Sequence, residues 1–385
     1  MTALRILVLV AGIVILLGTA NSVLTVLIVP RPSASLVVYP VIVVRAAFRR
    51  VAQLMRTYEA KDRGLAVSEP VALVTLLATW LTMTMFGFTL INWGIGTGSF
   101  TTAFSEAGSS VFTLGFTLTH TEGSRVADFV AAGTGLVLVA LQIAYLPTLY
   151  AAYNRRETLV TLLESRAGSP AWGPELLIRH QLVGSIDNLP SLFAEWERWA
   201  ADVAESHSTY TSLLYLRSPR AQNSWIVSLL AVLDAAALNL AMDPVGAPIE
   251  ARMCIRMGFT CLRDIAQATR IPYDADPDPD QPIALAEAAF DEAYDRLVAV
   301  GMATSRPKHE AWAHFRGWRV NYETMAYDLA YRLDAPPAKW TGPRRQFRSE
   351  SLEPVRPTDR QPTSVPSGPG GIIKEPEFRP DGPQL

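Results

Sequence analysis

Residues 71–93 read VALVTLLATWLTMTMFGFTLINW, a run of apolar and small polar residues without a single charged side chain. A helix needs about 20 such residues to cross the hydrocarbon core of a bilayer. Residues 6–29 and residues 129–153 meet the same test. The sequence therefore predicts an integral membrane protein that crosses the bilayer three times.

The first apolar run has a competing interpretation, a cleaved signal peptide, because Gly18, Thr19 and Ala20 are small residues. The apolar core of a signal peptide is usually about 7–15 residues long, whereas this run continues to Pro30. We therefore expect residues 1–30 to be a retained transmembrane helix.

The charges of the two loops predict the orientation. The segment 31–69 carries seven basic and three acidic residues, whereas the loop 94–128 has one basic residue, Arg125. Because loops rich in Lys and Arg stay in the cytoplasm, we expect segment 31–69 and everything after residue 154 to be cytoplasmic. The N-terminus and the loop 94–128 are then outside, in a multi-pass protein of the cell (plasma) membrane.

The basic segment 31–69 contains an amphipathic pattern at helical spacing from Val41 to Thr57. Such a pattern is typical of a helix that lies on the anionic inner leaflet, and a short helix buried against the bundle is the alternative. The apolar face would hold Val44, Phe48, Val51, Leu54 and Met55, opposite Arg45, Arg49 and Arg56.

The loop after the second span reads SFTTAFSEAGSSVFTLGFT over residues 99–117. Ser99 or Thr101 is suited to cap a short helix over roughly residues 101–111. This helix is too short to cross the bilayer and lies between two spans. Because irregular backbone at membrane depth must be buried in protein or line a water-filled cavity, the pattern predicts a re-entrant helix.

Over residues 70–156, the order of span, short helix, Thr113-Leu114-Gly115-Phe116 and span resembles the pore module of the potassium channel family. In that family a Thr-Val-Gly-Tyr-Gly segment surrounds the ion with carbonyl oxygens. The resemblance implies that Thr113, Leu114, Gly115 and Phe116 line an ion filter. The orientation expected from the loop charges agrees with this resemblance.

The outer part of the filter differs from the family pattern. Thr117 takes the place of the second filter glycine, and Leu118 that of the acidic residue after it. Glu106 lies on the expected short helix and either supports the filter from behind or stabilises the start of that helix. His120, near the outer mouth, is expected to be an exposed loop histidine.

The third span contains two glycines and a proline. By resemblance to the family, Gly133 and Gly135 are expected to form a gating hinge in the inner helix. Pro147 is expected to bend its inner end, because proline removes a helical hydrogen bond.

The resemblance implies a homotetramer, because one copy supplies one filter segment and a ring of carbonyls needs several. The expected function is a channel for a monovalent cation, with potassium as the first choice, and no enzyme activity, cofactor or metal site. The net charge of −2 gives no reason to expect nucleic acid binding. The alternative is a non-conducting membrane sensor or scaffold whose helical domain binds an unidentified ligand or protein partner.

Residues 157–334 predict an all-α cytoplasmic domain of six or seven helices, separated by Pro- and Gly-rich breaks. The apolar stretch 225–241 contains Asp234 and Asn239, which favours a buried core helix over a fourth span. Cys254 and Cys261 are expected to be buried free thiols. Residues 335–385 hold eleven of the 27 prolines and are expected to be disordered. The predicted fold is thus an all-α membrane protein with a re-entrant helix and a helical cytoplasmic domain.

Overall fold

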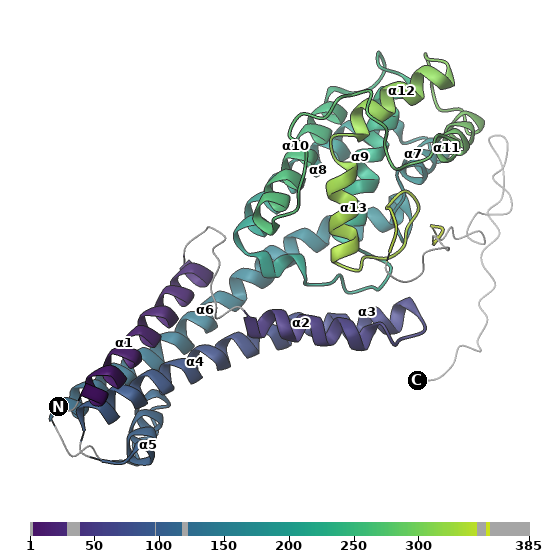
Figure 1. Cartoon of the computed structure of the whole chain (residues 1–385). Coiled ribbons are helices and arrows are strands. Elements are labelled where there is room, and N and C mark those ends of the chain that lie inside the picture. The colour runs from purple at the N-terminus through teal and green to yellow at the C-terminus, as the bar shows by residue number, and fades with distance from the viewer. Residues whose placement is uncertain (1–2, 29–38, 97, 118–121, 345–351, 355–385) are drawn as a thin grey trace, which may run out of the picture. The chain divides into compact units, whose positions relative to one another are not determined.

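The computed structural model describes residues 3–28, 39–96, 98–117, 122–344 and 352–354 (Figure 1). In these residues the regular secondary structure is helical, apart from one isolated β-bridge between Ala338 and Leu352. The predicted all-α class is therefore confirmed for the described part of the chain. His120 and Leu118 lie outside the described residues.

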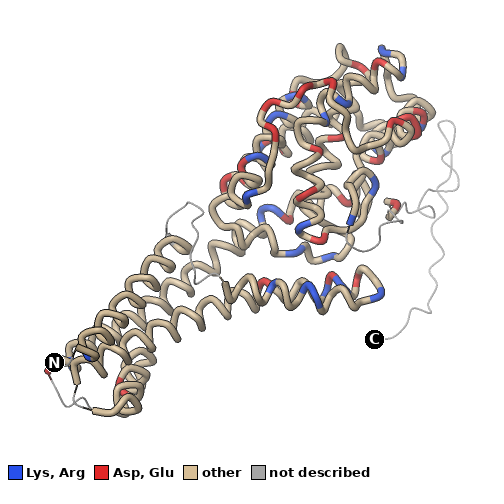
Figure 2. The backbone as a smooth tube through the Cα atoms, viewed as in Figure 1, with Lys and Arg blue, Asp and Glu red and all other residues tan. Residues whose placement is uncertain are grey.

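Three long helices make up the apolar part of the molecule: α1 (Ala3–Val23, continued by the π-helical turn Leu24–Ile28), α4 (Ser68–Ile95) and α6 (Glu122–Ala167). Each is long and apolar enough to cross a membrane. Charged side chains are sparse on α1, α4 and the first half of α6 (Figure 2). These helices indicate that the chain is a multi-pass membrane protein.

Glycines allow α1 and α4 to approach each other closely. A Cβ atom built on Gly12 of α1 would lie 2.7 Å from the carbonyl oxygen of Gly87 on α4. One built on Gly94 of α4 would lie 3.1 Å from the carbonyl oxygen of Arg5. Small residues at such contacts let two backbones pack by van der Waals contact, which is how helices associate in lipid.

The connection between α4 and α6 contains the short helix α5 (Phe100–Val111), which packs against both. The side chain of Ser99 accepts a hydrogen bond from the backbone N–H of Thr102, which confirms the predicted cap. The Asn92 amide donates to the Asp128 carboxylate at 3.0 Å and connects α4 to α6.

The basic segment forms two helices, α2 (Tyr39–Ala52) and α3 (Tyr58–Ala66). α2 ends at Ala52, whereas the predicted amphipathic helix continued to Thr57. Leu54 and Met55 therefore lie after the end of the helix. α2 packs against α4, with Val41 and Ala52 as its buried residues. Its arginines Arg45 and Arg49 bind protein groups. The reason is that carboxylates of α4 and of the helical domain lie within reach.

The helical domain follows, and α6 enters it without a break, since Val160, Leu163 and Ala167 are part of its core. Seven further α-helices lie between residues 157 and 334, after the end of α6. They are α7 (Gly173–Leu182), α8 (Leu189–Thr209), α9 (Trp225–Met242), α10 (Ile249–Thr269), α11 (Glu287–Ala299), α12 (Lys308–Arg319) and α13 (Glu323–Arg332).

Helix α9 is the centre of the helical domain. All its residues are buried, and six helices pack against it: α6, α7, α8, α10, α12 and α13. By length and composition it is a fourth candidate span. Because protein covers every face of α9, it lies in the described structure as the buried core helix that its Asp234 and Asn239 suggested.

The folded part of the chain continues beyond the predicted boundary at residue 334. Ala335, Ala338 and Trp340 are buried, and the guanidinium of Arg344 donates to the carbonyl oxygens of Ala335 and Pro336. The sequence did not indicate this because an isolated Trp in a Pro-rich stretch has no periodicity. The tail residues 345–351 and 355–385 lie outside the described residues.

Cys254 and Cys261 are buried and free, as predicted, and burial raises the pKa of both thiols.

Candidate functional site

The segment Thr113–Phe116 directly follows α5 and leaves its helical path. Thr113 and Gly115 have positive φ angles of 55° and 69°. A left-handed residue interrupts a helix or an extended strand, so two of them within three residues keep this segment irregular. Its side chains are exposed in a single copy of the chain, with Leu114 63% and Phe116 66% accessible.

The backbone conformation at Gly115, and not a lack of space for a side chain, favours glycine at this position. A Cβ atom built there would meet no atom within 4 Å in a single chain. The positive φ angle nevertheless disfavours any residue with a side chain. Thr113 has a side chain and still adopts a positive φ angle, which is an unfavourable conformation for it. Its N–H donates to the carbonyl oxygen of Ser110.

Ser109 holds this segment against α5, and it was not among the residues singled out from the sequence. The carbonyl oxygen of Ser109 accepts from the N–H of Leu114 at 2.8 Å. Its buried side-chain hydroxyl accepts from the N–H of Phe116 at 3.1 Å and, more weakly, from the N–H of Thr117 at 3.4 Å. The sequence gives no signal that distinguishes Ser109 from Ser105 and Ser110 on the same short helix.

The two residues predicted to support the filter lie in different surroundings. Glu106 is buried on α5, whereas Thr117 is half-buried at the end of the described segment. The backbone N–H of Thr117 donates to the hydroxyl of Ser109. The predicted filter residues therefore lie together at the end of α5, with Glu106 about two turns earlier on that helix.

The three residues predicted to form a gating hinge also differ from one another. A Cβ atom built on Gly135 would lie 2.0 Å from the carbonyl oxygen of Val111, so α6 touches the end of α5 at this glycine. A Cβ built on Gly133 would meet nothing within 4 Å. α6 continues as a helix through Pro147. Gly135 thus has a packing role at the base of the exposed segment.

A second set of functional candidates joins the segment α2–α3 to the helical domain. The Arg45 guanidinium binds the Glu69 carboxylate through two hydrogen bonds of 2.6 and 2.9 Å and stacks on the ring of Tyr215. Lys61 and Asp334, both almost fully buried, form an ion pair of 3.0 Å.

Arg217 completes this junction from the loop before α9. It binds the carboxylate of Asp62 and donates to the hydroxyl of Tyr58 and to the carbonyl oxygen of Leu333. Charged hydrogen bonds of this kind are stronger than neutral ones, and a buried ion pair is costly to break. The chain between the first two spans is therefore attached to the end of α13.

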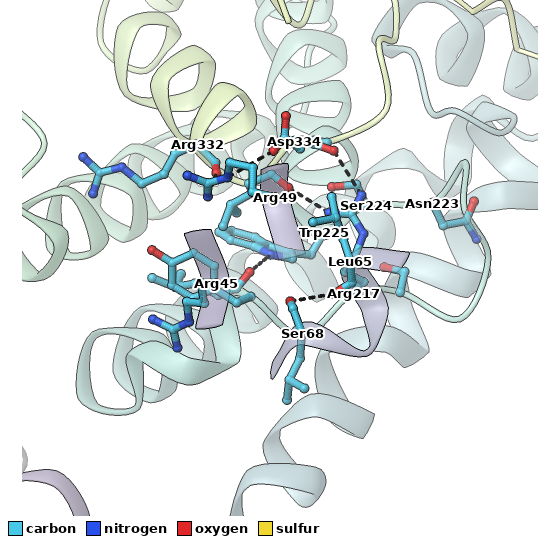
Figure 3. A pocket seen from close by; sticks show the side chains of 16 residues that line it. Arg45, Arg49, Leu65, Ser68, Arg217, Asn223, Ser224, Trp225, Arg332 and Asp334 are labelled. Atoms are coloured by element: carbon cyan, nitrogen blue, oxygen red, sulfur yellow. Dashed lines mark hydrogen bonds and ion pairs between the residues drawn. The ribbon is translucent and has the colours of Figure 1, made fainter. Parts of the chain in front are cut away.

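The same junction borders a small, open cavity of about 50 Å³ (Figure 3). It lies between the second half of α2, the start of α4, the loop before α9 and the end of α13. Arginines dominate its charged lining, which consists of Arg45, Arg49, Arg217, Arg332 and Asp334.

Where α6 enters the helical domain, the buried Arg156 donates to the carbonyl oxygens of Leu213 and Leu216. It also lies 3.1 Å from Nε2 of the buried His207. Burial and the nearby Arg156 lower the pKa of His207 well below its ordinary value of 6.5. This histidine is therefore neutral, and it serves as an acceptor that fixes the arginine.

No protein-family model matches this chain, and neither the curated proteins nor the solved structures contain a match to it.

Proposed function

We propose that this chain is a subunit of a cation channel, with Thr113 to Phe116 lining the pore. The observation that carries the proposal is the exposed, irregular segment after α5. Irregular backbone between two spans is tolerated only where protein or a water-filled cavity surrounds it. In a single copy this segment has neither, so further copies around a common axis would provide both.

The length of α5 supports the same proposal. Its 12 residues correspond to about 18 Å at 1.5 Å per residue, which is too short for a bilayer core of about 30 Å. A short helix of this kind enters the bilayer from one side, so the segment that follows it lies at membrane depth. We propose four copies and a monovalent cation, potassium in the first instance, with Thr117 altering the outer end of the filter.

The proposed orientation places α2, α3 and the helical domain in the cytoplasm and α5 toward the outside of the plasma membrane. The support is the excess of basic residues in segment 31–69. Thr101 and Arg63 are both exposed, so cysteines there are suited to labelling in intact cells. We expect modification of Thr101→Cys alone, and the opposite result would reverse the orientation.

The pore is tested by Gly115→Ala in reconstituted vesicles. The added Cβ at a φ of 69° costs about 1–2 kcal/mol per subunit, and four subunits converge on one filter. We expect potassium or rubidium flux to collapse while the protein still inserts and assembles. Gly18→Ala in α1 is the matched control, because a Cβ there meets no atom within 4 Å and Gly18 belongs neither to the filter nor to the expected hinge. Its flux should stay at the wild-type level.

The result that contradicts the proposal is a conducting wild-type protein whose flux and selectivity are unchanged by Gly115→Ala. The second candidate function, a non-conducting membrane sensor, would then be favoured. One observation supports that candidate: the helical domain is attached to the spans twice, through α6 and through the ion pairs of α2 and α3.

A further inference from the structure

The cavity at the junction of α2, α4 and the helical domain has an excess of positive charge. Its lining carries four arginines and one carboxylate, that of Asp334. The ion-pair partners of these groups add Lys61, Asp62 and Glu69. Five basic side chains thus face three acidic ones, which leaves two positive charges without a protein counter-ion in this group. Partly buried charge without a partner is costly, so an anion would stabilise this site.

Two arginines of α2 have donors left for such an anion. Arg45 uses Nε and Nη2 for Glu69, and Arg49 uses Nη2 for the carbonyl oxygen of Arg332 and Nε for Asp334. Among the described residues, Nη1 of either arginine donates to no protein acceptor. Because they are four residues apart on one helix, both guanidinium groups lie on the same face. Guanidinium groups bind phosphate oxygens well, often in pairs of parallel hydrogen bonds.

A buried hydroxyl is the second, independent sign of a ligand. Ser218 lines the cavity and is only 7% exposed, and its Oγ has no hydrogen-bond partner within the described parts of the chain. Buried polar side-chain atoms nearly always have a partner. An oxygen-rich group in the cavity would supply this missing partner.

The size of the cavity restricts the ligand. One water molecule needs roughly 10–15 Å³ of this kind of volume, so 50 Å³ accommodates a group of about four or five heavy atoms. A tetrahedral phosphate has five heavy atoms. Larger parts of a ligand would have to remain outside the opening.

We propose that this cavity binds a phosphate group, either of an anionic lipid headgroup or of a soluble phosphate. Ser68, the first residue of α4, lines the cavity, so a lipid of the adjacent leaflet lies within reach. The phosphate would accept hydrogen bonds from the arginines of α2 and from Ser218 in the loop before α9. It would thereby connect these two segments in addition to the existing ion pairs. The site does not depend on whether the pore conducts, and its test measures binding alone.

The test uses the purified full-length protein in phosphatidylcholine nanodiscs. Inorganic phosphate is titrated by calorimetry, and phosphatidylglycerol is added in a second series and counted by native mass spectrometry. We expect saturable binding of at least one probe. Arg49→Gln should weaken this binding about tenfold or more, since a charged hydrogen bond is lost, and Ser218→Ala about threefold to tenfold.

The matched control is Arg50→Gln, which removes the same charge from the neighbouring, exposed position of α2. It should change the affinity by less than about twofold, because screened surface charge contributes little. Competition between the probes identifies the source. Phosphate that displaces the lipid shows that the phosphate group suffices, and lipid binding that phosphate cannot displace assigns the site to a headgroup.

Two outcomes overturn the proposal: no saturable binding of either probe, or an equal loss of affinity in Arg49→Gln and Arg50→Gln. Arg49 also holds Asp334, so Arg49→Gln is checked for its wild-type circular dichroism. If that variant does not fold, Arg332→Gln and Ser218→Ala replace it, because Arg332 donates only to the carbonyl oxygen of Thr269 among the described residues. Unchanged affinity in both would equally overturn the proposal.

Discussion

Helices α1 and α9 are both long and apolar enough to cross a membrane, yet they have opposite surroundings. In α1 only 11% of the most apolar window is buried, and in α9 all of it is buried. Helix α1 packs along one face against α4, whereas α9 is enclosed by six helices. An apolar composition therefore allows a helix to lie either in lipid or in a protein core, and the neighbouring helices determine which of the two covers it.

The polar residues of the two helices show the same difference. In α9, the Asp234 carboxylate accepts from Arg319 at 2.7 Å and from the Tyr322 hydroxyl at 2.9 Å. The buried polar side chains of α1 are those of Thr19 and Ser22, and the hydroxyl of Ser22 accepts from the indole of Trp80 on α4. A buried carboxylate needs such partners, which only a protein environment provides.

The largest effect is expected from Ala236→Arg, in the middle of α9. Ala236 is fully buried, and an unpaired charge there costs several kcal/mol in addition to steric overlap. We expect the helical domain to lose its cooperative thermal unfolding transition, measured by circular dichroism in detergent.

The matched variant in α1 is Val14→Arg, at a position that is 61% exposed. A central arginine in a span costs about 3 kcal/mol by insertion scales, so this variant should reduce membrane insertion and leave the transition of the helical domain unchanged. Val245→Arg, just after α9 and exposed, should be neutral. A tolerated Ala236→Arg would mean that α9 is not enclosed by protein, and the comparison with α1 would fail.

A smaller effect, with opposite signs at two neighbouring glycines, is expected on α6. Gly135→Ala would place a Cβ 2.0 Å from a backbone oxygen of α5, and overpacking of this kind costs about 1–3 kcal/mol. Gly133→Ala meets no neighbour and should stabilise the helix by up to about 1 kcal/mol, because alanine favours helices over glycine. Thermal stability in detergent measures both, and a shift in the same direction would contradict the described contact of α5 and α6.

Local patterns predicted most of the fold from the sequence. Uninterrupted apolar runs identified α1, α4 and α6, and Ser99 predicted the start of α5. Asp234 and Asn239 within the apolar stretch of α9 indicated a buried helix. Each of these features depends on residues that are close together in the chain.

Features that depend on distant residues were not predicted. The attachment of α2 through Arg49 requires Asp334, which is 285 positions later in the numbering. The packing of Trp340 requires Trp172 and Phe315. Ser109 was missed because a serine on a helix gives no sign that its hydroxyl accepts from the backbone N–H groups that follow. Whether Thr113 to Phe116 line a pore stays a prediction.

The smallest expected effect comes from His207, a protein-enclosed base near the point where α6 enters the helical domain. Its Nε2 faces Arg156 and its Nδ1 lies 3.0 Å from the hydroxyl of Ser206, which itself donates to the carbonyl oxygen of Asp202. The neutral ring with a proton on Nδ1 satisfies all these groups. A second proton on Nε2 would face the arginine, and this charge and burial lower the pKa well below 6.5.

The pH dependence follows from the difference between the folded and the unfolded chain. Below pH 6.5 the unfolded chain binds a proton at residue 207 and the folded chain does not, so the free energy of unfolding falls as the pH decreases. The slope for one such group is about 1.4 kcal/mol per pH unit, and it vanishes above pH 6.5, where both states are neutral. Chemical unfolding at pH 7.5 and 5.5 should therefore show a loss of about 1 kcal/mol. In His207→Gln, whose amide oxygen can still accept from Arg156, this loss should shrink, while the contribution of His180, whose pKa burial also lowers, remains. An identical pH dependence in the wild type and His207→Gln would show that the histidine is not held neutral, and that solvent reaches the base of the helical domain where α6 enters it.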